Sequence, residues 1–233
     1  MKISKNFLVE ENTVTYIKSL NDNDLVENHC HKEIELLFIY EGYLDLVIED
    51  KKFYISKPCL IVFSPSVYHS VIHDNKTNYE RITLTVNKNK LPKEIYYDFI
   101  KKIKDTPILE LDEIIRIAKN IKEILLNKND KKYSKYIQAL IIEIIYIILL
   151  TDNHISEPES NPLITNIINY INANLCKMIT VSDISKNLFI SQSTICHTFK
   201  KYMNISVKQY IIQKKIKQNL LKTHSFSRSV HPP

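Results

Sequence analysis

The chain has 233 residues, of which 44% are hydrophobic and 25% are charged, a composition that supports one or two modest cores and excludes a wholly disordered chain. Its net charge of +6 is unevenly divided, because residues 161–233 carry nine Lys, one Arg and one Asp, a net charge of +9, whereas residues 1–160 carry −3. Four cysteines without a CxxC pair exclude a zinc finger and a disulfide framework, and without a signal segment or a membrane-length apolar run we expect a cytoplasmic protein with no membrane partner.

The first 92 residues predict a small β-barrel. Short runs of β-branched and aromatic residues alternate with turn residues such as Gly42, Pro58 and Pro65. Short strands at this spacing are typical of a small barrel or sandwich. The predicted strands are residues 34–40, 43–48, 53–55, 60–63, 69–72 and 81–86.

Four residues of this region have the spacing of a metal site. His29 and His31 alternate on one predicted strand and therefore share a face, a turn must bring Glu35 to them, and His69 lies on a facing strand. Three imidazoles and a carboxylate suit Fe, Zn, Mn or Ni. The alternative is a polar pocket, or histidines whose hydrogen bonds are satisfied at the mouth of the barrel.

The same four residues are candidates for an effector pocket, together with other side chains of the predicted barrel. Strand alternation leaves open which face each of these occupies, and aromatic residues at such positions are more often part of the core. Arg81 is one of only three arginines, so it is a candidate for recognising a carboxylate, with an ion pair as the alternative. The additional pocket candidates are Phe38, Tyr40, Tyr68 and Arg81.

Residues 93–150 change to a helical period of apolar residues. The last helix of this segment, residues 137–148, is apolar on nearly every side, which favours packing against a second copy of the chain. The alternative is a helix buried within one chain. Residues 151–161 are polar and acidic, with no apolar period, and predict a domain linker before a helix that opens at Pro162.

Residues 180–210 predict two capped helices with a tight turn between them. Thr180 is an N-cap candidate with Asp183 three residues on, a variant of the capping box, and Ser191 offers the second N-cap after a turn of about three residues. This is the layout of a helix-turn-helix, which binds DNA.

The second of these helices has two faces. Its apolar residues recur at helical spacing and face inward, which leaves a polar stripe on the opposite side. The stripe coincides with the basic end of the chain, where phosphate binding gains from counterion release, although a solvated Lys-rich face is the alternative reading of the charge. The candidates that face the DNA groove are Ser193, Cys196, His197 and Lys200.

The order of these parts is similar to that of the AraC-type family of bacterial transcription regulators. The resemblance lies in HCHKEIELLFIYEG (29–42), KPCLIVFSPSVYHS (57–70) and ITVSDISKNLFISQSTICHTFKKYMNISVKQYI (179–211). It implies an α+β fold with an N-terminal cupin-like β-barrel, apolar dimerisation helices and an all-α helix-turn-helix domain. The implied domains are a sensing barrel (1–92), a dimerisation segment (93–150), a linker (151–161), a partial DNA-binding domain (162–223) and a tail outside the family pattern (224–233).

The resemblance also implies a function. The protein is expected to be a regulator and not an enzyme, controlled by an unknown small-molecule effector, with no cofactor required unless the barrel holds a divalent metal. Its expected partners are double-stranded promoter DNA, a second copy of itself and RNA polymerase. Transfer by position places Ser193, Cys196 and His197 at base edges, Gln192 and Lys200 nearer phosphates, and Lys201 beside them in the basic pair.

Two departures from the family pattern weaken the expected DNA binding. Ser193 and Cys196 are small and His197 is only partly charged, so direct base readout is expected to be weak. The family has a second helix-turn-helix, whereas only ten residues follow Thr223, so we expect it to be missing. A frameshift or early stop is our hypothesis, which the downstream reading frames would test. Two alternative functions remain: a metal-dependent cupin enzyme, and a truncated partner that dimerises with full-length relatives and inhibits them.

Overall fold

The computed structural model describes residues 2–9, 12–20, 25–73, 77–103, 108–127, 133–151 and 158–226. They belong to two compact units, Met1–Pro158 and Glu159–Pro233. Most of the predicted linker, residues 152–157, lies outside the described residues. Within the described part, no helix combines the length and the apolar character that crossing a membrane requires.

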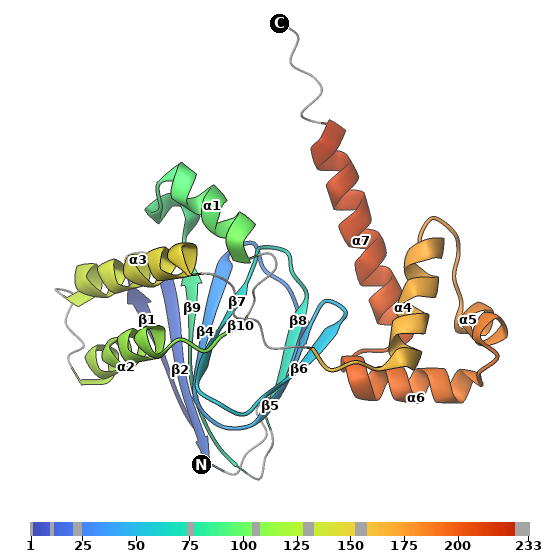
Figure 1. Ribbon diagram of the computed structural model, residues 1–233, viewed down its shortest axis with the longest axis horizontal. Helices are drawn as coiled ribbons and strands as arrows, with labels where there is room; N and C mark the ends of the chain where they lie inside the picture. Colours follow the sequence, from blue (N-terminus) through green and yellow to red (C-terminus); the bar gives the residue numbers. More distant parts are fainter. Residues whose placement is uncertain are drawn as a thin grey trace, which may run out of the picture. The chain divides into compact units, whose positions relative to one another are not determined.

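The N-terminal unit is built on two antiparallel sheets that face each other (Figure 1). The six-stranded sheet has the order β1-β2-β9-β4-β7-β10, and the four-stranded sheet has the order β3-β8-β5-β6. Strands β4 to β9 overlap the predicted runs, and β3 overlaps the predicted strand of His29 and His31 at His29 alone. Strands β1, β2 and β10 were not predicted. The strands are β1 (Lys2–Val9), β2 (Asn12–Leu20), β3 (Leu25–His29), β4 (Ile34–Glu41), β5 (Leu44–Ile48), β6 (Lys51–Ile55), β7 (Cys59–Phe63), β8 (His69–His73), β9 (Asn78–Val86) and β10 (Ile108–Leu109).

Strand β4 separates two hydrophobic cores. Leu36 and Phe38 belong to the core between the six-stranded sheet and the helices, whereas Leu37 and Ile39 belong to the core between the two sheets. Successive side chains of a strand point to opposite faces, and both faces of β4 are covered, which explains its nearly continuous apolar sequence. Glu35 is thereby placed on the face between the sheets.

Three helices pack on the outer face of the six-stranded sheet (Figure 1). They are α1 (Lys93–Ile103), α2 (Asp112–Asn127) and α3 (Ser134–Leu150). One face of α3 is buried in the core, but Tyr146 is 44% exposed and Leu150 is 82% exposed. The helix therefore leaves apolar side chains on its outer face.

Polar contacts attach these helices to the sheet. The Tyr40 hydroxyl donates to the Ala118 carbonyl of α2 at 2.7 Å. Glu80 accepts from the Tyr16 hydroxyl at 2.8 Å and pairs with Lys122 of α2 at 3.3 Å. This partly buried ion pair links α2 to β9.

The C-terminal unit contains the helices α4 (Pro162–Asn174), α5 (Val181–Leu188), α6 (Gln192–Met203) and α7 (Val207–Phe226). The predicted caps are present: Thr180 and Asp183 form a reciprocal capping box, and the Ser191 hydroxyl accepts from the Thr194 amide at 3.1 Å. Helix α7 continues to Phe226, beyond its predicted end at residue 223, because no Gly or Pro interrupts this part of the sequence.

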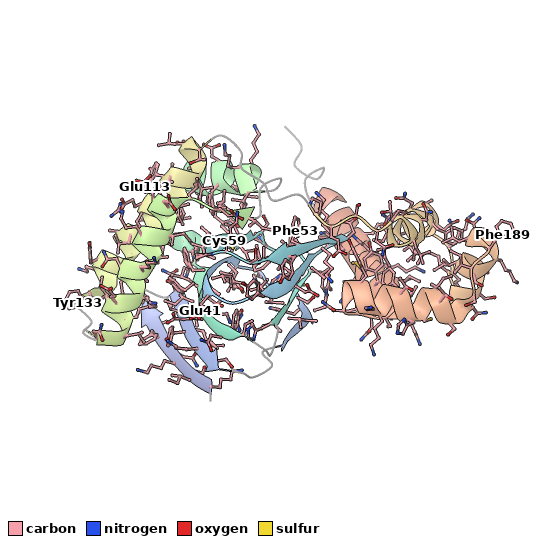
Figure 2. The ribbon with its side chains drawn as sticks, turned by 60° about the horizontal axis from the view of Figure 1, so that its bottom comes forward. Glu41, Phe53, Cys59, Glu113, Tyr133 and Phe189 are labelled. Atoms are coloured by element: carbon pink, nitrogen blue, oxygen red, sulfur yellow. The ribbon has the colours of Figure 1, made fainter. Side chains whose placement is uncertain are left out.

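The turns that end α5 and α6 use the left-handed backbone conformation. Asn204 has φ 60°, as expected for a residue that tolerates this region. Phe189 has φ 55°. Its side chain is 94% exposed, and it lies at the edge of this unit (Figure 2). A bulky residue in this conformation is uncommon and costs about 1 kcal/mol or more.

Candidate functional site

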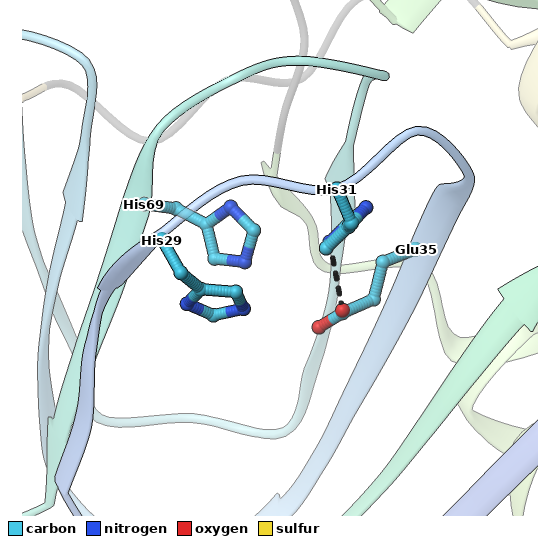
Figure 3. A group of neighbouring side chains, drawn as sticks. All are labelled: His29, His31, Glu35 and His69. Carbon is cyan, nitrogen blue, oxygen red and sulfur yellow. Dashed lines mark ion pairs between the residues drawn. The ribbon is translucent and has the colours of Figure 1, made fainter. Parts of the chain in front are cut away.

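The four predicted metal ligands come together between the two sheets (Figure 3). His29 ends β3 and pairs in register with His69, the first residue of β8, while Glu35 comes from β4. His31 lies in the loop between β3 and β4. The prediction that His29 and His31 alternate on one strand is therefore wrong, because the strand ends at His29 and the loop carries His31 into the cluster.

The hydrogen bonds of the cluster fix which ring nitrogens face one another. Nδ1 of His69 lies 3.0 Å from the Val67 carbonyl, and Nδ1 of His31 lies 2.8 Å from the Glu33 carbonyl. Since a carbonyl only accepts, each Nδ1 carries a proton and donates. Nε2 of His69, buried and without a hydrogen bond among the described residues, therefore presents a lone pair. Backbone acceptors of this kind commonly orient metal-binding histidines.

His31 and Glu35 form an ion pair within the cluster, with the Nε2 and Oε2 atoms 2.9 Å apart. The hydrogen bond to Glu35 raises the pKa of His31 above its usual value. Burial alone would raise the pKa of Glu35, but the hydrogen bond from His31 and the neighbouring imidazoles outweigh burial and lower it. Burial lowers the pKa of His69 to about 4, so this ring is neutral near pH 7. The cluster thus holds a carboxylate and at least one neutral imidazole.

This donor set fits a divalent metal. One ligand atom from each of His29, His31, Glu35 and His69 lies within 4.8 Å of all the others. Around a tetrahedral Zn²⁺, neighbouring ligand atoms are about 3.3 Å apart. To bind the ion, the longest distances between the four ligand atoms must therefore shorten by roughly an ångström or somewhat more. The ring of Phe63 stacks on His69 at 3.7 Å and gives the site an apolar wall. Phe63 was not predicted as a residue of this site. Its position at the end of a buried apolar strand was the signal in the sequence that could have indicated it.

The other predicted pocket residues are not gathered at this cluster. Phe38 and Tyr40 lie on the opposite face of β4, toward the helices, because strand alternation separates them from Glu35. Arg81 shares the inner face but pairs with Ile39, about 13 Å along the strand from Glu35. Tyr68 contacts the thiol of the exposed Cys30. Burial and this contact raise the pKa of Tyr68 above its usual value.

A second candidate surface is the outer face of α6. Its inward side chains Ile195, Phe199, Tyr202 and Met203 are buried, as the helical spacing predicts. The opposite side carries an exposed polar stripe, called here the α6 stripe, which consists of Gln192, Ser193, Cys196, His197, Lys200 and Lys201.

The chain is similar to several solved structures. No curated protein matches the chain. Among solved structures, the AraC-like transcriptional activator CuxR is 12% identical, with a TM-score of 0.46, over 94% of this chain and 80% of that one. ToxT from Vibrio cholerae is 11% identical, with a TM-score of 0.42, over 95% of this chain and 85% of that one. A cupin superfamily protein from Desulfitobacterium hafniense is 13% identical, with a TM-score of 0.33, over 37% of this chain and 77% of that one.

Most of the N-terminal unit matches a family model. The model of the AraC-like ligand-binding domain matches residues 13–145, more than half of the chain. This range runs from β2 to α3 and includes both sheets' facing strands, the His/Glu cluster and the helices on the outer face. By this match the chain belongs to the AraC-like ligand-binding domain family.

Proposed function

We propose that the protein is a transcription regulator that binds promoter DNA through its C-terminal unit and is controlled by a small-molecule effector in its N-terminal unit. The observation that carries this proposal is the α6 stripe, which follows a ligand-binding domain in the same chain. The regulator is proposed to act without catalysis, by a difference in effector affinity between conformations that bind DNA well and poorly.

The chemistry of the α6 stripe suits contact with a duplex. Ser193, Cys196, His197 and Lys200 follow the i, i+3, i+4, i+7 spacing and so share one face of the helix. Residues 161–233 carry a net charge of +9, which favours phosphate contacts. The short Ser193 and Cys196 side chains offer little discrimination between bases, so most of the affinity is expected to come from phosphates.

We expect Lys200→Ala to weaken binding to duplex DNA from the region upstream of the gene by several-fold and to lower the slope of log affinity against log salt by about 1. The reason is the loss of one phosphate contact and its counterion release. Mobility shifts at several salt concentrations measure both quantities. Lys93→Ala, an exposed lysine on α1, is the matched control and should change neither. Unchanged affinity and slope for Lys200→Ala would show that α6 does not face DNA.

We also propose that the regulator is a homodimer joined through α3. Ala139, Tyr146 and Leu150 are exposed along its outer face at helical spacing. Ile142 lies beside them and is only partly buried against the core of its own unit. The small Ala139 side chain allows two helices to approach closely. A stripe of this kind fits a copy of itself, as two-fold dimers require.

The dimer has a direct test. Tyr146→Glu places a charge among the exposed apolar side chains of α3 and is expected to convert a dimer to a monomer at micromolar concentration, measured by sedimentation equilibrium. Tyr54→Glu is the matched control, because Tyr54 is 62% exposed on β6, away from α3. A parent protein that sediments as a monomer, or a Tyr146→Glu protein that stays dimeric, would contradict this interface.

The His/Glu cluster favours a second candidate function, the binding of a divalent metal by His29, His31, Glu35 and His69. A metal bound there would supply a Lewis acid that coordinates an oxygen atom of an effector or, in the alternative of a cupin enzyme, of a substrate. The chain's own part is to orient the imidazoles through Val67 and Glu33 and to supply the negative charge of Glu35.

A further inference from the structure

A groove of about 490 Å³ lies at the ends of β2, β4 and β9, beside α1. None of its lining residues is a predicted site residue. The lining is mostly polar, with three apolar members, Ile34, Val86 and Tyr96. The polar members are Thr13, Lys32, Glu33, Thr85, Asn87, Lys88 and Asn89.

The groove shares a wall with the His/Glu cluster. Thr85 pairs in register with Glu35, so the two side chains lie on the same face of neighbouring strands. Lys32 and Glu33 belong to the loop that holds His31, and the Glu33 carbonyl accepts from His31. A molecule in the groove therefore contacts the loop and the strand that position the cluster.

The charge of the groove favours an anion. Lys32 and Lys88 are both exposed, and neither forms an ion pair within the part of the chain that the structure describes. Among the lining residues that the structure describes, Glu33 is the one carboxylate, so the two lysines outnumber it. Two ammonium groups beside hydroxyl and amide groups match a phosphoryl or carboxylate group on a hydroxylated carbon skeleton.

The groove is also connected to the helices. The Asn87 amide donates to Asn12 Oδ1 at 2.8 Å, and the Asn12 side chain, which is 0% exposed, donates in turn to Gln138 of α3 at 2.5 Å. Tyr96 of α1 lines the groove directly. A ligand that shifts Asn87 therefore acts on the helix whose outer face we propose to be the dimer interface.

We propose that this groove binds the anionic group of the effector, a small hydroxylated molecule that carries a phosphate or a carboxylate. The proposal rests on the proposed effector-sensing function and places the effector beside the His/Glu cluster, where it bridges the cluster and α1. The half-buried Tyr96 contacts its carbon skeleton beside the buried Ile34 and Val86, while Lys32 and Lys88 neutralise its charge.

Calorimetry on the full chain at constant ionic strength tests this with four probes: inorganic phosphate, glucose 6-phosphate, gluconate and neutral glucose. Phosphate and glucose 6-phosphate are expected to compete for one site if the effector is phosphorylated, and gluconate is expected to bind more tightly than phosphate if it is carboxylated. The double variant Lys32→Gln/Lys88→Gln is expected to weaken the anion by about tenfold or more, since two charge-assisted contacts are lost. Lys93→Gln/Lys101→Gln removes two exposed lysines of α1 outside the groove and should leave binding unchanged.

Glucose binding as tightly as the anions, an unaffected Lys32→Gln/Lys88→Gln variant, or an equal loss in the α1 control would each overturn the proposal. All four probes are measured without DNA, so the result is separate from the regulator proposal. Anion binding at the groove in a protein that fails to bind DNA would support the groove and contradict the DNA-binding function.

Discussion

Phe199→Ala is expected to lower the free energy of unfolding of the C-terminal unit by about 3–5 kcal/mol and to abolish DNA binding. Phe199 is 0% exposed, and its ring meets the Tyr210 ring edge-on at 5.3 Å and 69°. This contact joins α6 to α7. A small helical unit has little stability in reserve, so a loss of this size unfolds a large fraction of it.

The control for Phe199→Ala is the same substitution ten residues earlier in the chain. Phe189 is 94% exposed, so Phe189→Ala removes almost no buried area and should change stability by no more than about 0.5 kcal/mol. Urea denaturation followed by circular dichroism gives the stability, and mobility shift gives the DNA binding. Equal stability losses in the two variants would mean that the α6–α7 contact is not the core of this unit.

The C-terminal unit shows what the sequence could predict well. Its helix starts depend on contacts between residues three apart, such as Thr180 with Asp183 and Ser191 with Thr194, and these are local. The inward face of α6 follows from helical spacing alone, which is equally local. Phe189 was the exception, because its left-handed conformation is imposed by the chain reversal between α5 and α6, and residue type gives no sign of it.

The N-terminal unit was harder to predict because its contacts are distant in sequence. The four metal-ligand candidates were found from spacing, but the end of β3 at His29 depends on pairing with β8, which the sequence does not show. The faces of Phe38 and Tyr40 depend on helices that follow more than fifty residues later. The groove beside Glu35 joins strand ends, a loop and α1, so no single segment carries its pattern.

His69→Ala is expected to weaken Zn²⁺ binding by at least about 100-fold, because it removes one of the four candidate ligands. In the parent protein, free Zn²⁺ at about 100 times its Kd should raise the free energy of unfolding by about 2.7 kcal/mol, and a chelator should remove that gain. At the same Zn²⁺ concentration, His69→Ala should gain no more than about 0.4 kcal/mol, which the chelator removes. Metal content by mass spectrometry and thermal unfolding with and without Zn²⁺ measure both.

His73→Ala is the matched control for His69→Ala. His73 lies on the same strand and is equally buried, 1% exposed, but it stacks on Tyr79 at 4.4 Å and contacts Thr77, about 13 Å along β8 from the cluster. The two substitutions remove the same ring from the same strand. Zn²⁺ should therefore stabilise His73→Ala by as much as it stabilises the parent protein.

Acid should affect the same site in a defined direction. The folded pKa of His69 is about 4, below its unfolded value of 6.5, so between these values the unfolded chain binds a proton that the folded chain excludes, and stability falls as the pH falls through this window. The raised pKa of His31 has the opposite effect: its ion pair with Glu35 stabilises the protein below pH 6.5 and is lost as the pH rises through the folded pKa. A metal must displace the His31 proton, so Zn²⁺ affinity should rise with pH. Zn²⁺ stabilisation that is independent of pH, or that is undiminished in His69→Ala, would contradict binding at this cluster.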